Sequence, residues 1–460
     1  MKRLLISAAH KSSGKTTVSI GLCAALTEQG QVVQAFKKGP DYIDPMWLGR
    51  ATGRSCYNLD FYLSSNEEIR QDFAVHSDGC DMALIEGNKG LYDGLALDGS
   101  DSNAALAKLL KTPVVLVVDT RGITRGIAPL LKGYSEFDAD IDIAGVILNQ
   151  VGGSRHEAKL RAAVEFYTDI PVLGAVYRNP DLVIDERHLG LMPSNEAGDA
   201  RQLVKACSEA IRSGVDLDRI RSIPCPPFKF EKTEAVAPVA AASVRIAIAE
   251  DAAFGFYYPA DLETMRSLGV ELVSVNMLED DALPEIDGLF IGGGFPETHM
   301  SQLETNTRMR TSVRDAIESG LPVYAECGGL MYLARSIKWG ENQAKMVGII
   351  PGDILMHDRP VGRGYTRLQE TNDHPWPGSP SAGKSAEFPA HEFHYSSLEN
   401  LEKSPTYAYK VLRGTGITGE NDGYTYKNLL ASYVHLRNVA GNQWVHRFVD
   451  FVRECKSRTI

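Results

Sequence analysis

Short apolar runs that end in loops rich in Gly, Asp or Asn alternate with amphipathic segments through the first half of this chain. The runs are Leu4–Ala8, Met82–Ile85, Val114–Val118 and Ala144–Leu148, and the helical patterns between them include Thr16–Gln29, Asn103–Leu110 and His156–Tyr167. Continuous apolar strands separated by helices are typical of a parallel sheet that is covered on both faces. The first half is therefore predicted to be a doubly wound α/β domain.

The same alternation restarts in the second half of the chain. Predicted strands are Arg245–Ala249, Glu271–Val275, Gly288–Ile291 and Pro322–Tyr324, and predicted helices are Ala260–Ser267 and Thr307–Ser319. Between the halves, residues 223–243 are rich in Pro, Ala and Val, which suits an extended connector. A chain of 460 residues is long enough for two hydrophobic cores. We expect two α/β domains, residues 1–222 and 244–460, joined by a linker over 223–243.

Composition limits the possible partners and the compartment. The chain has 48 basic and 59 acidic residues and a net charge of -11, which argues against a general electrostatic grip on nucleic acid or anionic membranes. Its seven cysteines lack paired spacing and predict reduced thiols. No segment approaches the roughly 20 apolar residues that a membrane span needs. The sequence therefore predicts a cytoplasmic protein with neither nucleic acid nor a membrane as partner.

A phosphate-binding loop follows the first predicted strand. Leu4–Ala8 leads through His10 and Lys11 into Ser12, Ser13, Gly14, Lys15, Thr16 and Thr17, where a helical pattern begins. A strand, a loop of small residues and a helix are the setting of a Walker-type loop, whose backbone N–H groups surround phosphate. Lys15 would supply a positive charge and the Thr16 hydroxyl could ligate Mg²⁺. Ala8 or Ala9 stands where the leading glycine is expected, yet the pattern predicts a nucleotide site.

Carboxylates follow other predicted strands. Asp41 and Asp44 lie in the segment 39–45, and Glu86 directly follows Met82–Ile85. Parallel α/β sheets bind ligands at the carboxyl ends of their strands, and Mg²⁺ prefers hard oxygen ligands. The alternative is that these acids cap helices or face solvent. We predict that Thr16, Asp44 and Glu86 bind the magnesium ion of a metal–nucleotide complex.

A candidate nucleophile lies in the second half. Strand Pro322–Tyr324 leads into Glu326, Cys327, Gly328 and Gly329, and then into a helical pattern. A cysteine between a strand and a helix, with glycines behind it, is typical of a nucleophile elbow, where the helix N-terminus favours the thiolate. A buried structural cysteine is the alternative. The segment Gly292–Glu297 follows another strand, and the backbone N–H groups of Gly293 and Gly294 could form an oxyanion hole.

A base for this thiol is expected near the C-terminus. His435 follows the apolar segment 429–434 and could accept the thiol proton. His391 and His394 compete for the same role, and spacing alone does not choose among the three. An acid two residues beyond His435 would orient it, but that position is Arg437. The sequence therefore predicts thiol-based acyl chemistry without revealing its third member.

The combined motifs resemble the cobyrinic acid a,c-diamide synthase family over essentially the whole chain. The family pattern is carried by Ser12–Thr17, Gly39–Pro45, Glu86–Gly87, Gly90–Gly94, Glu186–Leu191, Phe254–Pro259, Gly292–Glu297, Cys327–Gly329, His391–Ser396 and Ala431–Leu436. So many ordered motifs leave little room for coincidence.

The resemblance implies a dethiobiotin-synthetase-like N-terminal domain and a class I, triad-type glutamine amidotransferase domain. It implies a ligase that uses ATP, Mg²⁺ and glutamine to amidate the a and c acetate side chains of a corrin-type tetrapyrrole such as cobyrinic acid, as in cobalamin biosynthesis. Cys327 would form a glutamyl thioester and His435 would raise its reactivity. Asp41 and Asp93 would lie near the reacting carboxylate, and Asn149 near adenine. Whether the chain forms a homodimer stays open.

One departure from the family pattern bears on the substrate. Asn88 and Lys89 stand between Gly87 and Gly90, where family members usually carry apolar residues. Lys89 would meet substrate charge, unless it is simply solvated as most lysines are. Sirohaem, sirohydrochlorin and nickel-sirohydrochlorin therefore stay open as substrates. A P-loop ATPase switch with a non-catalytic C-terminal binding module is the alternative from another class, and it predicts no glutamine hydrolysis.

Overall fold

The computed structural model describes residues 1–184, 186–187, 190–227, 244–378, 387–402 and 405–459. The chain divides into two compact units, which are unit 1, Met1–Glu186 with Leu191–Thr233, and unit 2, Arg187–Gly190 with Glu234–Ile460. Most of the expected linker, residues 228–243, lies outside the described residues, as do His188 and Leu189 of one family motif.

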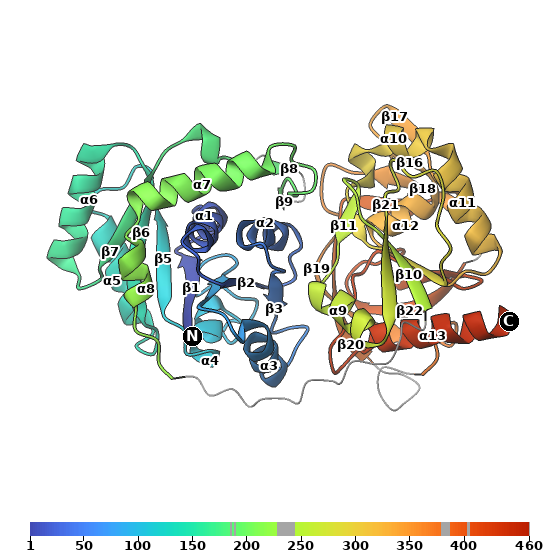
Figure 1. The fold of residues 1–460 in the computed structure, drawn as a ribbon, viewed down its shortest axis with the longest axis horizontal. Helices are drawn as coiled ribbons and strands as arrows, with labels where there is room; N and C mark the ends of the chain where they lie inside the picture. The colour runs from blue at the N-terminus through green and yellow to red at the C-terminus, as the bar shows by residue number, and fades with distance from the viewer. Residues whose placement is uncertain (185, 188–189, 228–243, 379–386, 403–404, 460) are drawn as a thin grey trace. The chain divides into compact units, whose positions relative to one another are not determined.

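Unit 1 is built on a seven-stranded sheet in the order β3-β2-β4-β1-β5-β6-β7 (Figure 1). All neighbouring strands in it pair in parallel. The strands are β1 (Lys2–Ala8), β2 (Val33–Lys38), β3 (Tyr57–Leu59), β4 (Met82–Glu86), β5 (Val114–Asp119), β6 (Ile143–Val151) and β7 (Val172–Tyr177). Strands β1, β2, β4 and β5 are almost wholly buried. Strands β4 and β5 are apolar up to a final acid, as expected for central parallel strands, whereas β2 also buries Gln34, Lys37 and Lys38.

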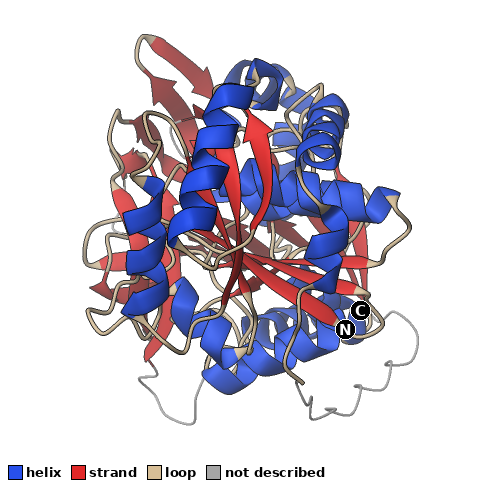
Figure 2. Ribbon diagram, turned by 90° about the vertical axis from the view of Figure 1, so that its left-hand side faces the viewer, coloured by secondary structure: helices blue, strands red, loops and turns tan. Residues whose placement is uncertain are grey.

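Helices cover this sheet and connect its strands. They are α1 (Lys15–Glu28), α2 (Ile43–Thr52), α3 (Asn66–Ser77), α4 (Asn103–Leu109), α5 (Ile127–Phe137), α6 (Ser154–Tyr167), α7 (Ala200–Gly214) and α8 (Leu217–Ser222). Helix α1 packs against α2 and α7, and α5 packs against α6. Figure 2 shows the strands of this unit between helices, which is the doubly wound arrangement that the sequence predicts.

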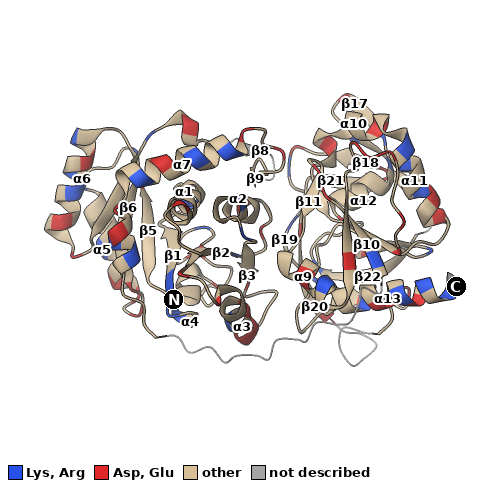
Figure 3. Ribbon diagram, in the orientation of Figure 1, with Lys and Arg blue, Asp and Glu red and all other residues tan. Residues whose placement is uncertain are grey.

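The outer helices are amphipathic. In α7, Cys207, Ser208 and Ile211 face the interior while Arg201 and Lys205 are exposed. Acidic and basic residues both occur along α6, α7 and α13 (Trp444–Thr459), as Figure 3 shows. These helices therefore gain stability mainly from burying one face against the sheet or a neighbouring helix.

Unit 2 contains a nine-stranded mixed sheet in the order β12-β10-β13-β15-β24-β23-β22-β19-β20. The strands are β10 (Val244–Ala249), β12 (Val270–Val275), β13 (Gly288–Ile291), β15 (Val323–Glu326), β19 (Gly362–Glu370), β20 (Glu387–His394), β22 (Thr406–Arg413), β23 (Asn421–Tyr426) and β24 (Leu429–Ser432). Strands from β12 to β24 pair in parallel, and those from β24 to β20 pair antiparallel. His391 and His394, considered below, lie on β20 in the antiparallel half, and His435 follows β24 and forms a bridge with His391.

Smaller sheets and helices complete unit 2. Strands β11 (Phe254–Phe256) and β14 (Gly293–Gly294) form a two-stranded pair, and β16 (Ala334–Trp339), β17 (Asn342–Lys345), β18 (Ile350–Met356) and β21 (Ser396–Glu399) form a four-stranded sheet. The helices are α9 (Pro259–Ser267), α10 (Met300–Thr305), α11 (Thr307–Glu318), α12 (Gly328–Leu333) and α13. One buried apolar cluster includes Leu330 and Val313, and another includes Phe290 and Phe448.

The structure confirms the α/β class predicted for both halves. Predicted and observed elements agree closely; for example, the strand predicted over Arg245–Ala249 is β10 and the helix predicted over Thr307–Ser319 is α11. The sequence did not predict the antiparallel half of the second sheet. All seven cysteines are free thiols, as expected. Among the described helices, none has both the length and the apolar composition of a membrane span.

Candidate active site

The phosphate loop lies between β1 and α1 in unit 1. Ser12 has a φ of 62° and Gly14 a φ of 84°, so the loop turns twice through the left-handed region. A Cβ atom at Gly14 would lie 2.0 Å from Asn149 Nδ2, which shows how closely the end of β6 approaches the loop. Asn149 Nδ2 donates a hydrogen bond to the Ser13 carbonyl oxygen at 2.9 Å. The buried side-chain amide of Asn149 therefore stabilises the loop by a hydrogen bond to its backbone.

Lys15 extends from the first turn of α1 toward the loop that follows β4. Its Nζ donates to the Lys89 carbonyl oxygen at 2.6 Å. Burial lowers the pKa of Lys15 to about 8, although the nearby Glu86 carboxylate opposes this shift. Thr16 and Thr17 lie in the same helical turn. The predicted phosphate-binding residues are thus contiguous at the N-terminus of one helix.

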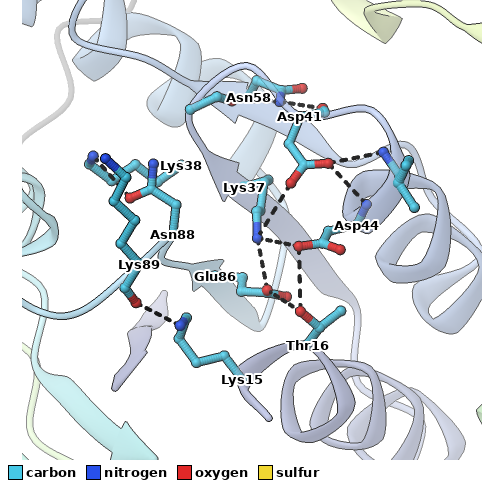
Figure 4. A network of polar contacts seen from close by, with 12 residues as sticks. Lys15, Thr16, Lys37, Lys38, Asp41, Asp44, Asn58, Glu86, Asn88 and Lys89 are labelled. Carbon is cyan, nitrogen blue, oxygen red and sulfur yellow. Dashed lines mark hydrogen bonds and ion pairs between the residues drawn. The ribbon is translucent and has the colours of Figure 1, made fainter. Parts of the chain in front are cut away.

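A cluster of three carboxylates and one lysine lies beside this loop (Figure 4). Lys37 Nζ is 2.5 Å from Asp44 Oδ2, 2.8 Å from Glu86 Oε1 and 3.7 Å from Asp41 Oδ2. The Thr16 hydroxyl donates to Glu86 Oε1 at 2.8 Å and lies 3.4 Å from Asp44 Oδ2. The structure therefore brings together Thr16, Asp44 and Glu86, the three residues predicted to bind magnesium, and adds Lys37 as the counter-ion of the two acids.

Burial and mutual repulsion perturb the titration of this cluster. Burial, with repulsion from Asp44, raises the pKa of Asp41 to about 7. Burial also raises the pKa of Glu86, although Lys37 opposes the shift. Burial would lower the pKa of Lys37, but attraction by Asp44 and Glu86 outweighs it and raises this pKa well above its ordinary value. Burial would likewise raise the pKa of Asp44, but Lys37 outweighs burial and lowers it. The cluster is thus held together by one strongly basic ammonium group.

The donor set fits a magnesium ion bound together with a nucleotide. Within the described residues, no hydrogen-bond donor reaches the buried Glu86 Oε2. The described part of the chain contains no group of three or more His, Cys, Asp or Glu residues that could hold a metal alone. Mg²⁺ is usually bound by one or two carboxylates together with substrate phosphates, so that a complete protein cage is not required. Thr16, Asp44 and Glu86 would supply the protein's share of the ligands.

The predicted substrate residues lie around the same strand ends. Asp41 Oδ1 accepts from the backbone N–H groups of Ile43 and Asp44, at 3.0 and 3.2 Å, so Asp41 also caps α2. Asp93 Oδ2 accepts from the Gly90 N–H at 3.0 Å in the loop after β4.

Lys38 and Lys89 both lie close to Asn88, near the carboxylate cluster (Figure 4). Lys38 Nζ lies 3.3 Å from Asn88 Oδ1, and burial lowers the pKa of Lys38 to about 8. The neighbouring Lys89 has a φ of 39°. This pair gives the site positive groups beyond Lys15 and Lys37.

In unit 2, Cys327 occupies a sharp turn between β15 and α12. Its φ is 47° and its ψ is -98°, a strained conformation for a residue with a side chain. The Cys327 N–H donates to the Ser432 carbonyl oxygen at 2.7 Å, which ties the turn to the end of β24. Burial raises the pKa of the thiol, and the carboxylates of Glu297 and Glu326 raise it further. The thiol therefore needs a base to become a nucleophile near neutral pH.

The two glycines predicted for the oxyanion hole contact both sides of this site. A Cβ atom at Gly293 would lie 2.8 Å from His435 Cε1, and one at Gly328 would lie 3.0 Å from the Gly294 nitrogen. Strand β14 therefore lies between the histidine and the residue that follows Cys327. Larger side chains would not fit these approaches, which gives a physical reason for glycine at Gly293 and Gly328.

The three candidate histidines have different surroundings. His435 Nδ1 lies 3.1 Å from Glu326 Oε2. His391 stacks on His435 with ring centroids 5.0 Å apart, and its Nδ1 lies 3.5 Å from the Tyr258 hydroxyl.

His394 is held in a different way. Its Nδ1 lies 2.8 Å from the Ser396 carbonyl oxygen, and its Nε2 lies 3.5 Å from Glu392 Oε2. Both of its ring nitrogens thus face oxygen atoms of neighbouring residues. His435 is the candidate that adjoins both Gly293 and a carboxylate.

Two contacts were not foreseen from the sequence. The sequence motifs give no specific role to Lys37, and Glu326 appears in them only as the neighbour of Cys327. Each is a charged residue at or next to the end of a buried strand and beside a motif. This pattern is the sequence signal that could have singled out both residues. Arg437, at the position expected for an acid, lies over the Tyr258 ring at 5.4 Å from its centroid.

The fold and the two sites define a protein with a P-loop nucleotide-binding unit and a glutamine amidotransferase unit. Residues 5–191 match the CobQ/CobB/MinD/ParA nucleotide binding domain, and residues 245–442 match the CobB/CobQ-like glutamine amidotransferase domain.

Three relatives called cobyrinate a,c-diamide synthase match nearly the whole chain. The protein of Magnetococcus marinus is 44% identical over 98% of this chain and 97% of its own length. Those of Methanosarcina acetivorans and Listeria innocua are 42% and 39% identical, over 97% and 95% of this chain and 95% and 96% of their own lengths. The chain belongs to the cobyrinate a,c-diamide synthase family and is a glutamine-dependent amidating ligase.

Proposed function

We propose that this protein converts the a and c acetate carboxylates of a corrin-type tetrapyrrole, cobyrinate, into amides, with ATP as the activating reagent and glutamine as the nitrogen source. The observation that carries the proposal is that one chain holds two chemical sites. One is a phosphate loop beside clustered carboxylates, and the other is a strained cysteine turn that adjoins β14, the strand that also contacts His435. The similarity to cobyrinate a,c-diamide synthases along nearly the whole chain supports the choice of substrate.

The phosphate-loop site would activate the substrate carboxylate. A carboxylate is a poor electrophile because its charge repels nucleophiles and oxide is a poor leaving group. Attack of a carboxylate oxygen on the γ-phosphorus of ATP would form an acyl phosphate and release ADP, which removes both obstacles. The backbone N–H groups of Ser12–Thr17 and the Lys15 ammonium would bind the phosphates. Magnesium, when bound by Thr16, Asp44 and Glu86, would neutralise phosphate charge.

Other residues of unit 1 would position the reactants. Asp41 and Asp93 lie near Lys37 and Lys15 and would orient the carboxylate against the nucleotide, and Lys89 would meet a substrate carboxylate. Asn149 would contact adenine in addition to supporting the loop, as the family resemblance implies. Ammonia would then attack the acyl carbon, and inorganic phosphate would leave as the amide forms.

The cysteine site would release the ammonia. The Cys327 thiol would transfer its proton to His435 and attack the side-chain carbonyl of glutamine. His435 would return this proton to the amide nitrogen, so that the C–N bond breaks, ammonia leaves and the glutamyl thioester forms. Water would then hydrolyse the thioester to glutamate and restore the thiol. The N–H groups of Gly293 and Gly294 are proposed to stabilise the oxyanion, because β14 adjoins both Gly328 and His435.

The substrate is tested by mass spectrometry of the products from a panel of tetrapyrroles. The panel contains cobyrinic acid, hydrogenobyrinic acid, sirohaem and sirohydrochlorin with and without nickel. We expect diamidation of cobyrinic acid that depends on both ATP and glutamine. Preferential amidation of sirohaem or of a sirohydrochlorin would replace cobyrinate as the substrate and give a role to Lys89.

The separation of the two half-reactions is tested with Cys327→Ser. This variant should lose glutamine-dependent amidation and keep most ammonia-dependent amidation, because only nitrogen release needs the thiol. Loss of both activities in a folded variant would contradict the two-site scheme.

The phosphate-loop assignment is tested with Lys15→Ala. Amidation should then fail with glutamine and with ammonia alike, because neither nitrogen source can act on an unactivated carboxylate. Normal amidation by this variant would show that the nucleotide binds elsewhere.

A further inference from the structure

Glu326, the residue directly before Cys327 in the chain, contacts the candidate base. It ends β15 and is 2% exposed. Its Oε2 lies 3.1 Å from His435 Nδ1. Its Oε1 accepts from the Tyr324 hydroxyl at 2.6 Å and from the Leu436 N–H at 2.9 Å. The carboxylate is therefore fixed on both of its oxygens inside unit 2.

This contact determines which nitrogen of His435 carries the proton. The partners of Glu326 at Tyr324 and Leu436 are hydrogen-bond donors, so the carboxyl group needs no proton of its own. A carboxylate only accepts, and His435 Nδ1 must therefore be the protonated nitrogen. The lone pair is then on Nε2, which becomes the atom able to take a proton from the thiol.

The same contact would stabilise the charge that forms during catalysis. The buried thiol does not ionise readily by itself, so attack on glutamine has to coincide with proton transfer to His435. That transfer turns the imidazole into an imidazolium, and a carboxylate at Nδ1 favours the charged form. The stabilisation is strong in a site that excludes water, because charge-assisted hydrogen bonds gain strength there.

One strand end fixes both the nucleophile and the base. Cys327 N–H binds the Ser432 carbonyl oxygen at 2.7 Å, and the Glu326 carboxylate binds the Leu436 N–H at 2.9 Å. Glu326 and Cys327 thus hydrogen-bond to the two ends of the segment 432–436, which contains His435. The position two residues beyond His435, where an acid was expected, holds Arg437 instead.

We propose that Glu326 is the positioning residue of His435 and supplies the third member of the glutaminase site. It holds the Nδ1–H tautomer, aims Nε2 at the thiol and stabilises the imidazolium. The inference rests on the proposed roles of Cys327 and His435.

The test compares Glu326→Gln with wild-type protein. The substituted glutamine side chain has nearly the same shape as glutamate, but its amide group can donate to Nδ1 and favour the wrong tautomer. We expect kcat for glutamate release from glutamine to fall by about 10³-fold or more, while KM for glutamine and ammonia-dependent amidation stay within about threefold. Tyr324→Phe is the matched control, because it removes a hydrogen bond to the same carboxylate and keeps the acid. Its kcat should fall by less than tenfold.

A second measurement observes His435 directly in the wild-type protein. Nitrogen NMR of wild-type protein labelled at histidine, with His435→Asn to assign the signal, should show the His435 proton on Nδ1. A proton on Nε2, a kcat in Glu326→Gln within tenfold of wild type, or a loss expressed only in KM would overturn the inference. Normal glutamate release by Cys327→Ala would instead overturn the proposed function, so the two failures are distinguishable.

Discussion

Lys37 and Glu86 are register partners on adjacent parallel strands, and the Lys37 ammonium lies 2.8 Å from Glu86 Oε1. The lysine comes from the end of β2 and the acid from the end of β4, so two strands place opposite charges beside the phosphate loop. Asp41 and Asp44 approach the same ammonium. Lys37 is therefore the counter-ion of all three carboxylates in this cluster.

Lys37→Met should destabilise the protein by about 3–5 kcal/mol, because it leaves buried carboxylates without their counter-ion. Urea denaturation followed by fluorescence would measure the change. Lys205→Met is the control. Lys205 lies on the surface of α7, where its side chain is 73% exposed and forms an ion pair of 3.7 Å with Glu209, which is 63% exposed. The control should be as stable as wild type. Equal stability of both variants would show that Lys37 does not compensate the cluster.

The same variant should respond more strongly to magnesium. Without Lys37, Asp44 and Glu86 offer an uncompensated carboxylate pair, and a bound ion stabilises the folded state by mass action. We expect millimolar Mg²⁺ to raise the Tm of Lys37→Met by more than that of wild type. The measurement is made without nucleotide. If Mg²⁺ raises the Tm of both proteins equally, Asp44 and Glu86 are not metal ligands.

Gly14→Ala should weaken nucleotide binding by tenfold or more. The new Cβ would meet Asn149 Nδ2 at 2.0 Å, and the φ of 84° already disfavours a side chain. Gly30→Ala is a matched control, because Gly30 has a φ of 83° but nothing within 4 Å of the built Cβ. It shares the backbone strain and lacks the clash. Titration calorimetry with Mg-ATP should show weaker binding in Gly14→Ala alone.

Lys38→Met should raise KM for the tetrapyrrole and leave KM for ATP unchanged. Lys38 is buried, and its ammonium is held by Asn88 at 3.3 Å beside Lys89, which suits capture of a substrate carboxylate. We expect at least a tenfold rise, measured by steady-state kinetics with saturating ATP and ammonia. Lys108→Met, which breaks a surface ion pair with Asp138, should change neither constant. An effect on ATP alone would assign Lys38 to the nucleotide.

Asp261→Asn should flatten the dependence of stability on pH. Burial raises the pKa of Asp261 from its ordinary value of 3.8 to about 7, although Arg437 and Trp444 oppose the shift. The folded state therefore holds a proton that the unfolded chain loses, so this group's contribution is full below about pH 4 and is lost as pH rises through 7.

Chemical denaturation at several values between pH 4 and 7 measures this effect. Wild type should lose more stability across that range than Asp261→Asn. Asp450→Asn, at a side chain that is 59% exposed, should follow the wild-type curve. Parallel curves for wild type and Asp261→Asn would show that Asp261 titrates normally.

The sequence predicts several parallel strands and helices of both units because their signals are local. The apolar run Val114–Val118 becomes β5 (Val114–Asp119), and the loop before Lys15 leads into α1, because hydrophobic period and turn residues are read over a few neighbours. The antiparallel strands β19, β22 and β23 were not predicted. Each of them mixes buried positions with partly or fully exposed ones, so their apolar signal is weaker than that of a central parallel strand.

The sequence by itself determined the α/β class, the phosphate loop at Gly14 and Lys15, and the strand-to-helix turn at Cys327, since each depends on residues adjacent in the chain. Only the tertiary structure decided that Lys37 pairs with Glu86, 49 residues away, and that Glu326 pairs with His435, 109 residues away. Strand order and register create such pairs, and both are set by packing across the whole sheet.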